Sequence, residues 1–392
     1  MRIVQAATQP PLATALAEAW MRDESFVLLP ARTSLDPATV TSWLAGAPAS
    51  WAEGHYVLLT SGSTGLPKLV VGARARTQAL ARALHVAQDL DEVAEAVVLL
   101  PLSYSYAFVN QFVWATIHGR RLVVTEGLGA PAEVLAALDG ARDAMLCLVG
   151  SQVPLLRQHA GSRRFPGVTR LHFAGGRFPQ EQLPYLRGLF PAARIYNNYG
   201  CAEALPRLTV RRADASDEGA NVGAPLPGIE LAAAPDGRLL FRSPFRAVGL
   251  VEDGVVRVLD DAEWLASGDL AEPVGDGSWR LLGRSGDVFK RFGEKVSLAS
   301  LLAAVHAVWP GAAAFHLESA QGEPAHVLTL APAPDPAALR DVLAALRRGF
   351  SRAQWPVRIE ARATLPTLPN GKPDGRALAD SPGAETLWRQ RL

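Results

Sequence analysis

A regular alternation of two residue patterns between residues 55 and 200 constrains the fold of this chain most strongly. Segments with helical periodicity, such as "YAFVNQFVWATIHG" and "PAEVLAALDG", separate short runs of apolar, strand-forming residues. Strands that alternate with helices predict parallel βαβ units and therefore an α/β fold, in which ligands bind beyond the carboxyl ends of the strands. The expected strands are "HYVLL" (55–59), "AVVLLPL" (96–102), "RLVVTE" (121–126), "AMLCLVG" (144–150) and "RLHFAGG" (170–176).

The pattern changes after residue 221. Three Asp-Gly pairs, in "APDGRLLF", "VEDGVVRV" and "VGDGSWRL", are flanked by alternating apolar residues and predict β-hairpins. Further on, helical "SLASLLAAVHAVW" and "AALRDVLAALRRGF" alternate with strand-like "AHVLTLAP" and "WPVRIEA". We therefore expect a large N-terminal domain over 1–283, with an α/β part over about 1–221 and a β-rich part over about 222–283. A small α+β domain should follow over 284–392.

Composition excludes several classes of protein. Apolar residues make up 49% of the 392 residues and charged residues 20%, which indicates a globular chain. The net charge of +1 gives no reason to expect a nucleic-acid partner. The only cysteines, Cys147 and Cys201, form neither a disulfide framework nor a zinc site, which favours a reduced cytoplasm. The N-terminus is interrupted by prolines and no apolar run spans a bilayer, so we expect a cytoplasmic protein without a signal peptide or membrane attachment.

The stretch "TSGSTGLPK" (60–68) follows the first strand directly, where a ligand loop belongs. Its glycines allow a tight turn that presents backbone N–H groups to an anion, its hydroxyls add donors, and Lys68 adds a mobile charge. These groups suit a polyphosphate, although Leu69 breaks the Walker spacing. A flexible surface loop fits the same residues. Taken alone, the stretch leaves both interpretations open.

Four further motifs follow in order: "NNYGCAEA" (197–204), "SGD" (267–269), "GRSGDVFKRFGEKVS" (283–297) and "LPNGKPDGRAL" (368–378). Together with the loop they resemble the adenylate-forming superfamily of acyl-CoA synthetases, aryl-acid and peptide-synthetase adenylation domains, and luciferases. The resemblance covers roughly residues 55 to 380. It implies that a carboxylate attacks the α-phosphate of ATP to give an acyl-adenylate, from which a thiol then displaces AMP. It also implies that the small domain rotates between the two steps about a hinge at 284–287.

The resemblance assigns roles position by position. Lys68, Glu203 and Lys372 would be catalytic, with Glu203 also a ligand of Mg²⁺ and Lys372 serving only adenylation. The hinge would include Gly286 and Asp287. The acid would contact Tyr104, Ser105, Tyr106, Ala174 and Cys201. The nucleotide would be bound by Thr60, Ser61, Gly62, Ser63, Thr64, Gly65, Gly175, Gly176, Asn198, Tyr199, Gly200, Asp269 and Arg284.

Three departures from the superfamily pattern stand out. Only about 60 residues precede the loop, so much of the first N-terminal subdomain is expected to be missing or compressed, with a partner subunit as one possible replacement. Ala202 replaces the usual threonine of the glutamate motif and removes a hydroxyl near the phosphates. Gly286 occupies the position where relatives commonly have a hinge Asp or Lys.

The segment "PLSYSYAF" (101–108) lies where relatives contact the acid. Amino-acid-activating domains have an aspartate in place of Ser105, so an α-ammonium group would be buried here without a counter-charge. Two tyrosines and a serine suit a flat aromatic acid with a hydroxyl, such as a hydroxybenzoate. They also fit an acyl chain, or tyrosines that only pack.

The acceptor remains open between coenzyme A and the phosphopantetheine of a free-standing carrier protein. The stretch 340–392 carries a mild basic excess that suits either, or is simply a solvated face. The favoured function is an ATP- and Mg²⁺-dependent acid–thiol ligase. Its rivals are a fatty-acid ligase with the same mechanism and a shortened homologue that binds nucleotide or acyl-adenylate without catalysis.

Overall fold

A computed structural model describes residues 1–31, 33, 35–61, 67–176, 178–213, 220–292, 294–318, 324–367, 373–380 and 385–390. The chain forms two compact units. The first comprises Met1–Ser267 and Glu272–Arg280, and the second comprises Gly268–Ala271 and Leu281–Leu392. The division therefore runs through two strands, whereas the sequence predicts a single boundary after residue 283. That boundary and the hinge at 284–287 stay predictions.

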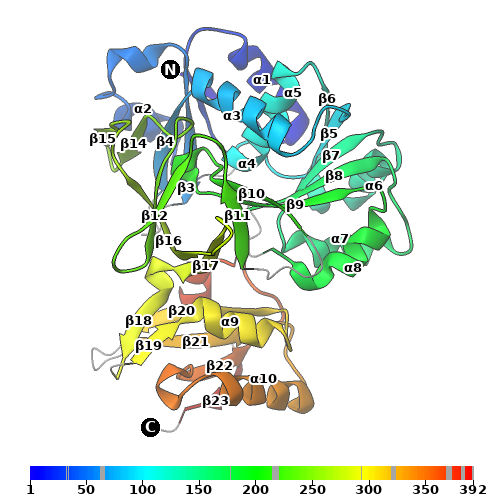
Figure 1. Ribbon diagram of the computed structural model, residues 1–392, viewed down its shortest axis with the longest axis vertical. Helices are drawn as coiled ribbons and strands as arrows, with labels where there is room; N and C mark the ends of the chain where they lie inside the picture. Colours follow the sequence, from blue (N-terminus) through cyan, green and yellow to red (C-terminus); the bar gives the residue numbers. More distant parts are fainter. Residues whose placement is uncertain are drawn as a thin grey trace. The chain divides into compact units, whose positions relative to one another are not determined.

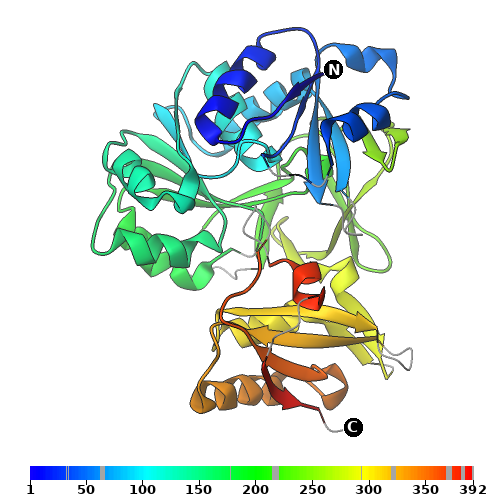
Figure 2. The ribbon, with the colours of Figure 1, turned by 180° about the vertical axis from the view of Figure 1, so that it is seen from behind.

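Two sheets organise the first unit (Figure 1). Its smaller sheet has the order β1-β2-β3-β4-β14-β15, in which β1, β2 and β3 are parallel and the rest antiparallel. Figure 2 shows α1 beside these first strands. The strands are β1 (Arg2–Val4), β2 (Phe26–Leu28), β3 (His55–Ser61), β4 (Pro67–Ala73), β14 (Gly249–Glu252) and β15 (Val255–Val258).

The strand expected at 55–59 forms, but it does not join the parallel strands at 96–176 as predicted, because it lies in the smaller sheet, where it pairs in parallel with β2. It forms β3, which pairs with β4 as an antiparallel hairpin, with Thr60 opposite Lys68. Only residues 62–66 connect the two strands, whereas a parallel crossover needs a dozen or more residues. The motif "TSGSTGLPK" therefore joins the two strands of a hairpin, and its residues Gly62, Ser63, Thr64 and Gly65 lie outside the described part of the chain.

The larger sheet has the order β12-β13-β16-β17-β11-β10-β9-β8-β7-β5-β6 among the described residues. Its β6-β5-β7-β8-β9 part is parallel and confirms four of the five expected strands. The strands are β5 (Glu95–Val98), β6 (Arg121–Val124), β7 (Ala144–Leu148), β8 (Val168–Phe173), β9 (Arg194–Tyr199), β10 (Thr209–Arg212), β11 (Asn221–Pro225), β12 (Glu230–Ala233), β13 (Arg238–Arg242), β16 (Leu265–Pro273) and β17 (Trp279–Arg284).

Apolar side chains fix the helices on the parallel strands. In Figure 1, α6, α7 and α8 lie beside β7 and β8, and their buried side chains share one core with these strands. The segment η2, a π-helix, contacts β5 and β7. The helical segments of the first unit are α1 (Gln9–Trp20), α2 (Pro37–Trp43), η1 (Ala49–Ala52), α3 (Arg74–Ala87), α4 (Ser105–Ala107), η2 (Phe108–Val113), α5 (Trp114–Ile117), η3 (Gly127–Gly129), α6 (Pro131–Asp139), α7 (Gln152–Ala160), η4 (Gln180–Gln182), α8 (Leu183–Leu189) and η5 (Ala202–Ala204).

The helix expected over "YAFVNQFVWATIHG" forms, but it is irregular at its centre. The Asn110 side-chain amide donates to the Tyr106 carbonyl oxygen, and the Gln111 amide donates to the Val97 carbonyl oxygen, both at 2.8 Å. Side chains that bond to backbone carbonyls compete with the regular helical pattern, and single π turns of this kind occur often at functional sites. Both side chains are buried, and that of Gln111 bonds to β5 of the larger sheet.

The Asp-Gly pairs lie in the expected turns between strands. In the turn from β14 to β15, Asp253 and Gly254 have φ of 48° and 76°, as a type I′ turn requires. The hairpin β12–β13 forms at the first pair, and β16 neighbours β17 across the third. Because β14 pairs with β4, residues 222–283 contribute to both sheets and form no sheet of their own.

A four-stranded sheet, β20-β21-β22-β23, forms the core of the second unit. Helices α9 and α10 pack against it and confirm the two predicted helices. The N-terminus of α10 is capped by Asp335, whose carboxylate accepts from two backbone N–H groups. The elements are η6 (Ser285–Asp287), β18 (Val288–Arg291), β19 (Glu294–Ser297), α9 (Leu298–His306), β20 (Ala312–Glu318), β21 (Pro324–Leu330), α10 (Pro336–Gly349), η7 (Arg352–Gln354), β22 (Arg358–Ala361), α11 (Gly375–Asp380) and β23 (Glu385–Arg389).

Candidate active site

Lys68 and Glu203 are 135 residues apart in the sequence and meet in the structure. The Lys68 ammonium group forms an ion pair with the Glu203 carboxylate, and both side chains are more than four-fifths buried. A second carboxylate, that of Glu252, lies 3.7 Å from the same nitrogen but is largely exposed. Glu252 is opposite Lys68 in the β4–β14 pairing. Sequence reasoning missed this contact because the pairing of β14 with β4 leaves no local signal.

The turn after β9 places Glu203 beside Lys68. A Cβ atom on Gly200 would lie 1.9 Å from the Pro206 carbonyl oxygen, so only glycine permits this close backbone approach. The Leu208 N–H then donates to the Tyr199 carbonyl oxygen at 2.8 Å. Within the turn, η5 carries Glu203, whose own carbonyl oxygen accepts from the Ala247 N–H at 2.9 Å. The backbone of this turn is therefore held from both sides.

Other predicted nucleotide-binding residues lie at strand ends. The Thr60 hydroxyl donates to the Lys68 carbonyl oxygen at 3.4 Å, which supports the hairpin, and Ser61 ends β3. Gly175 and Gly176 follow β8, and Gly175 has a φ of 79°, a conformation that favours glycine. Ala174 precedes them, with its N–H bonded to the Leu148 carbonyl oxygen. Their contact with a nucleotide or acid stays a prediction.

Six polar side chains form a second group, here called the buried polar cluster. They come from the expected acid-binding segment and the helical turn that follows it, from the parallel strands and from the turn after Glu203. Sequence reasoning proposed two of them, Tyr106 and Asn198, and missed the rest because lone polar residues among apolar ones carry no motif. The members are Tyr106, Asn110, Cys147, His172, Asn198 and Arg207, each at least nine-tenths buried.

Contacts within the buried polar cluster are specific. The Arg207 guanidinium donates from Nη2 to Asn110 Oδ1 at 2.7 Å and lies 5.5 Å from the centre of the Tyr106 ring. Asn198 accepts from the side-chain amide of Gln88 at 2.9 Å. Asn198 is thus held at the end of α3, and the expected contact with adenine stays a prediction.

Burial shifts the protonation of this cluster strongly. Loss of water raises the pKa of the Cys147 thiol to about 12 and raises the pKa of Tyr106 well above its usual value. The pKa of His172 falls to about 3, first because it is fully buried and then because Arg207 and Arg170 are nearby. The pKa of Arg207 is lowered to about 10, mainly by burial. At neutral pH the cluster therefore carries one positive charge, on Arg207.

His172 should make the protein sensitive to acid. Its pKa is depressed from 6.5 to about 3, so the unfolded chain binds more protons between these values and stability falls as pH drops below about 6.5. A single group with this shift lowers the free energy of unfolding by about 2 kcal/mol at pH 5. Between pH 7 and pH 5, we expect the free energy of unfolding of His172→Gln to fall by about 2 kcal/mol less than that of the wild type. Urea unfolding at the two pH values measures both losses.

The exposed His159 of α7 provides the control. His159→Gln should keep the acid sensitivity of the wild type. Equal losses for His172→Gln and the wild type would contradict a neutral, buried His172.

The other residues predicted to bind the acid are close in sequence to members of the buried polar cluster. Tyr104 and Ser105 are half-buried at the start of α4, and burial raises the pKa of the Tyr104 hydroxyl. Cys201 is half-buried just before η5. Tyr106 is thus the predicted acid-binding residue that the structure brings into contact with Arg207.

Two predicted residues of the second unit form a pair. Arg284 Nε lies 3.1 Å from Asp269 Oδ1, and the Ser285 hydroxyl donates to the Gly268 carbonyl oxygen. The pair agrees with the prediction that Asp269 and Arg284 act at the same place. That they bind the ribose of the nucleotide stays a prediction. Asp287 ends η6, in which Gly286 is exposed. Lys372 lies outside the described residues.

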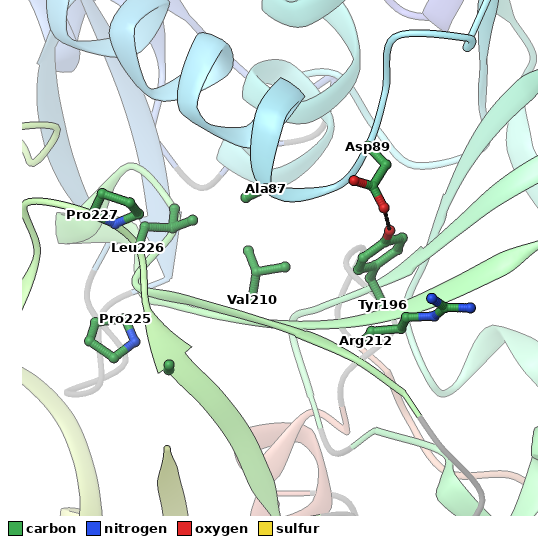
Figure 3. Close-up of a pocket in the computed structure, with 9 residues that line it drawn as sticks. Ala87, Asp89, Tyr196, Val210, Arg212, Pro225, Leu226 and Pro227 are labelled. Atoms are coloured by element: carbon green, nitrogen blue, oxygen red, sulfur yellow. Dashed lines mark hydrogen bonds between the residues drawn. The ribbon is translucent and has the colours of Figure 1, made fainter. Parts of the chain in front are cut away.

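A separate pocket of about 320 Å³ lies where the end of α3 faces β9, β10 and β11 (Figure 3). The Tyr196 hydroxyl donates to the Asp89 carboxylate at 3.1 Å on its wall. It contains none of the residues that the sequence assigns to the nucleotide or acid. Across the described ranges, no group of three or more His, Cys, Asp or Glu side chains is arranged to hold a metal, and no helix is long and apolar enough to cross a membrane.

Comparison with known proteins identifies the family. The model of the AMP-binding enzyme family matches residues 10–239, more than half of the chain. The chain belongs to this family. It is 27% identical over 356 residues to the 2-hydroxy-7-methoxy-5-methyl-1-naphthoate–CoA ligase of Streptomyces carzinostaticus, covering 84% of this chain and 63% of the ligase. It is 25% identical to the anthranilate–CoA ligase of Pseudomonas aeruginosa, covering 74% of this chain and 58% of that one. The chain thus spans less than two thirds of these relatives.

Solved structures agree on the fold. The anthranilate CoA ligase AuaEII in complex with anthranoyl-AMP superposes with a TM-score of 0.71 at 18% identity, covering 96% of this chain and 77% of that one. The O-succinylbenzoate CoA synthetase of Bacillus subtilis in complex with AMP gives 0.70 at 18% identity, covering 84% and 70%. These likenesses confirm the α/β fold that the sequence predicts.

Proposed function

We propose that this member of the AMP-binding enzyme family is an AMP-forming acid–thiol ligase that activates an aryl acid. The observation that carries the proposal is the largely buried Lys68–Glu203 pair at the "TSGSTGLPK" hairpin. A lysine held at a loop rich in N–H and hydroxyl groups suits the negative charge of a polyphosphate, and the carboxylate beside it suits a magnesium ion bound to the phosphates. The relatives named above, a naphthoate ligase and an anthranilate ligase, act on aryl acids.

The adenylation step needs charge control more than a side-chain nucleophile. A carboxylate oxygen of the acid bonds to the α-phosphorus while the bond to pyrophosphate breaks. Lys68 would neutralise charge on the leaving pyrophosphate, and Lys372 would do so at the α-phosphate. In the second step the sulfur of a thiol bonds to the acyl carbon and AMP leaves. The acceptor is coenzyme A or the phosphopantetheine of a carrier protein.

The residues present fit a magnesium ion. Magnesium in nucleotide sites takes one or two protein carboxylates and completes its shell with phosphates and water. Glu203 offers one such carboxylate beside the hairpin, and no larger group of ligands exists among the described residues. When bound, the ion would neutralise phosphate charge. Glu203 would then exchange its contact with Lys68 for the ion.

The charge of the buried polar cluster favours an acid that carries no protonated amino group. The one charge of the cluster is positive, on Arg207, and no carboxylate of the described residues contributes to the pKa of Arg207. An α-ammonium group would be repelled there. We also propose a cytoplasmic location, which the free thiols of Cys147 and Cys201 support.

Acid-dependent release of pyrophosphate from ATP and Mg²⁺ tests this function. The acids are hydroxybenzoates, cinnamates, fatty acids of graded length and amino acids. We expect release with aryl acids, and AMP and a thioester once coenzyme A or a carrier protein is added. Release only with fatty acids would replace the substrate class, and silence with retained ATP binding would favour a binding protein.

A further inference from the structure

Arg207 is a buried cation with unused hydrogen-bonding capacity. Its side chain is fully enclosed, with 1% of the residue exposed. Nη2 donates to Asn110, but Nε and Nη1 have no hydrogen-bond partner among the described residues. A guanidinium keeps its charge in proteins, and leaving its N–H groups unpaired in a buried site is costly. Such a group is matched when a ligand supplies an oxygen acceptor.

The neighbours of Arg207 do not supply that acceptor. Among the residues that the structure describes, no acidic side chain contributes to its electrostatic environment, in which the partners are the Tyr106 hydroxyl and the Cys147 thiol. Both of these stay protonated at neutral pH because burial raises their pKa values. His172 stays neutral because burial, together with the nearby Arg207 and Arg170, lowers its pKa. Arg207 is therefore without a counter-charge in the part of the chain that the structure describes.

Arg207 also lies close to the proposed chemistry along the backbone. It is four residues after Glu203 and directly follows Pro206, whose carbonyl oxygen is in close contact with Gly200. Its guanidinium faces the ring of Tyr106, which belongs to the segment expected to contact the acid. The same short turn thus presents Glu203 to Lys68 and Arg207 to Tyr106.

We propose that Arg207 determines substrate specificity by binding a second oxygen group of the acid, a ring hydroxyl or a second carboxylate. The substrate class is then an aryl acid that carries an acceptor oxygen besides the carboxylate that reacts. This inference rests on the proposed function. It adds a residue and a chemical criterion that the acid-binding segment alone does not provide.

Isosteric acids test the proposal in the wild-type protein. An amino group replaces a hydroxyl at nearly the same size, but it donates hydrogen bonds and accepts them poorly. We expect kcat/KM for pyrophosphate release with the best hydroxybenzoate or benzenedicarboxylate to exceed that with benzoate and with the matching aminobenzoate by about 10- to 100-fold, as expected for a hydrogen bond to a charged group. Equal values for the oxygen acid, benzoate and the amino isostere would overturn the inference.

Arg207→Met removes the N–H groups at similar length. We expect it to reduce the preference for the oxygen acid over benzoate by about 10- to 100-fold while benzoate keeps its own kcat/KM within a few fold. Arg74→Met is the matched control, since Arg74 is a buried arginine that donates to the backbone carbonyl oxygens of Ala19, Trp20, Arg22 and Glu24. It should leave the ratio unchanged.

The possible outcomes separate the two proposals. If Arg207→Met does not fold, the wild-type comparison decides alone. An unchanged ratio in a folded Arg207→Met would overturn the inference while leaving the ligase function intact. Failure of every acid to release pyrophosphate would overturn the proposed function itself, and the inference with it.

Discussion

Lys68→Ala should lower kcat for acid-dependent pyrophosphate release by about 10²- to 10³-fold, the usual cost of removing one charge-stabilising donor. Lys68 is the cation that the structure holds at the hairpin, between β3 and the turn that carries Glu203. Without the Lys68 ammonium group, the negative charges of the Glu203 carboxylate and of the phosphates would lie side by side without compensation by this lysine. The measurement is single-turnover formation of acyl-adenylate at saturating ATP, which separates chemistry from ATP affinity.

Glu252→Gln is the control for this variant. Glu252 contacts the same ammonium group at 3.7 Å, yet 65% of its side chain is exposed. Exposed ion pairs contribute little, so kcat should change less than about threefold. A Lys68→Ala protein that keeps wild-type kcat would contradict the role of Lys68. A loss in Glu252→Gln as large as that in Lys68→Ala would mean that the whole ion cluster, rather than Lys68, is required.

Lys372→Ala should separate the two half-reactions. We expect adenylate formation to fall by about 10²- to 10³-fold, because the variant loses the charge that would stabilise the attack at phosphorus. When preformed acyl-adenylate is added, the rate of thioester formation should stay within a few fold of the wild-type rate, since the lysine serves only the first step. Rapid-quench assays of each half-reaction measure the two rates in one preparation.

The second half-reaction is the internal control for folding. A protein that transfers the acyl group at the normal rate is folded and binds the adenylate. Full adenylation by Lys372→Ala would contradict the assignment of the lysine. Equal loss in both steps would contradict the division of labour between them.

Much of the site could be predicted because its residues stand in contiguous motifs. Lys68 and Glu203 each lie in a short pattern whose order along the chain is informative, and the structure brings them together. The strands β5 to β8 were predictable as well, since parallel strands covered by helices are mostly apolar and alternate with helical segments. The strand β9, with the sequence RIYNNY, lacks such an apolar run and was not among the expected strands. Local pattern therefore determined most of the parallel part of the larger sheet.

The rest depended on pairings between distant segments. Apolar content predicts β3 as a strand, but its antiparallel partner is set by the short connection to β4. Glu252 reaches Lys68 only because β14 joins the same sheet. Arg207 lies in a turn and His172 in a strand, and each is a single buried polar residue that belongs to no sequence motif. Long-range packing, which a local pattern does not encode, decided each of these features.

In the proposed reaction, this chain joins the acid to AMP before a thiol attacks. The most direct test supplies an aryl acid whose carboxylate is labelled with ¹⁸O, together with ATP, Mg²⁺ and the thiol acceptor. Because the acid oxygen bonds to the α-phosphorus and stays there when the thioester forms, mass spectrometry should find one ¹⁸O in the released AMP. Label in inorganic phosphate, with ADP as the nucleotide product, would contradict the account.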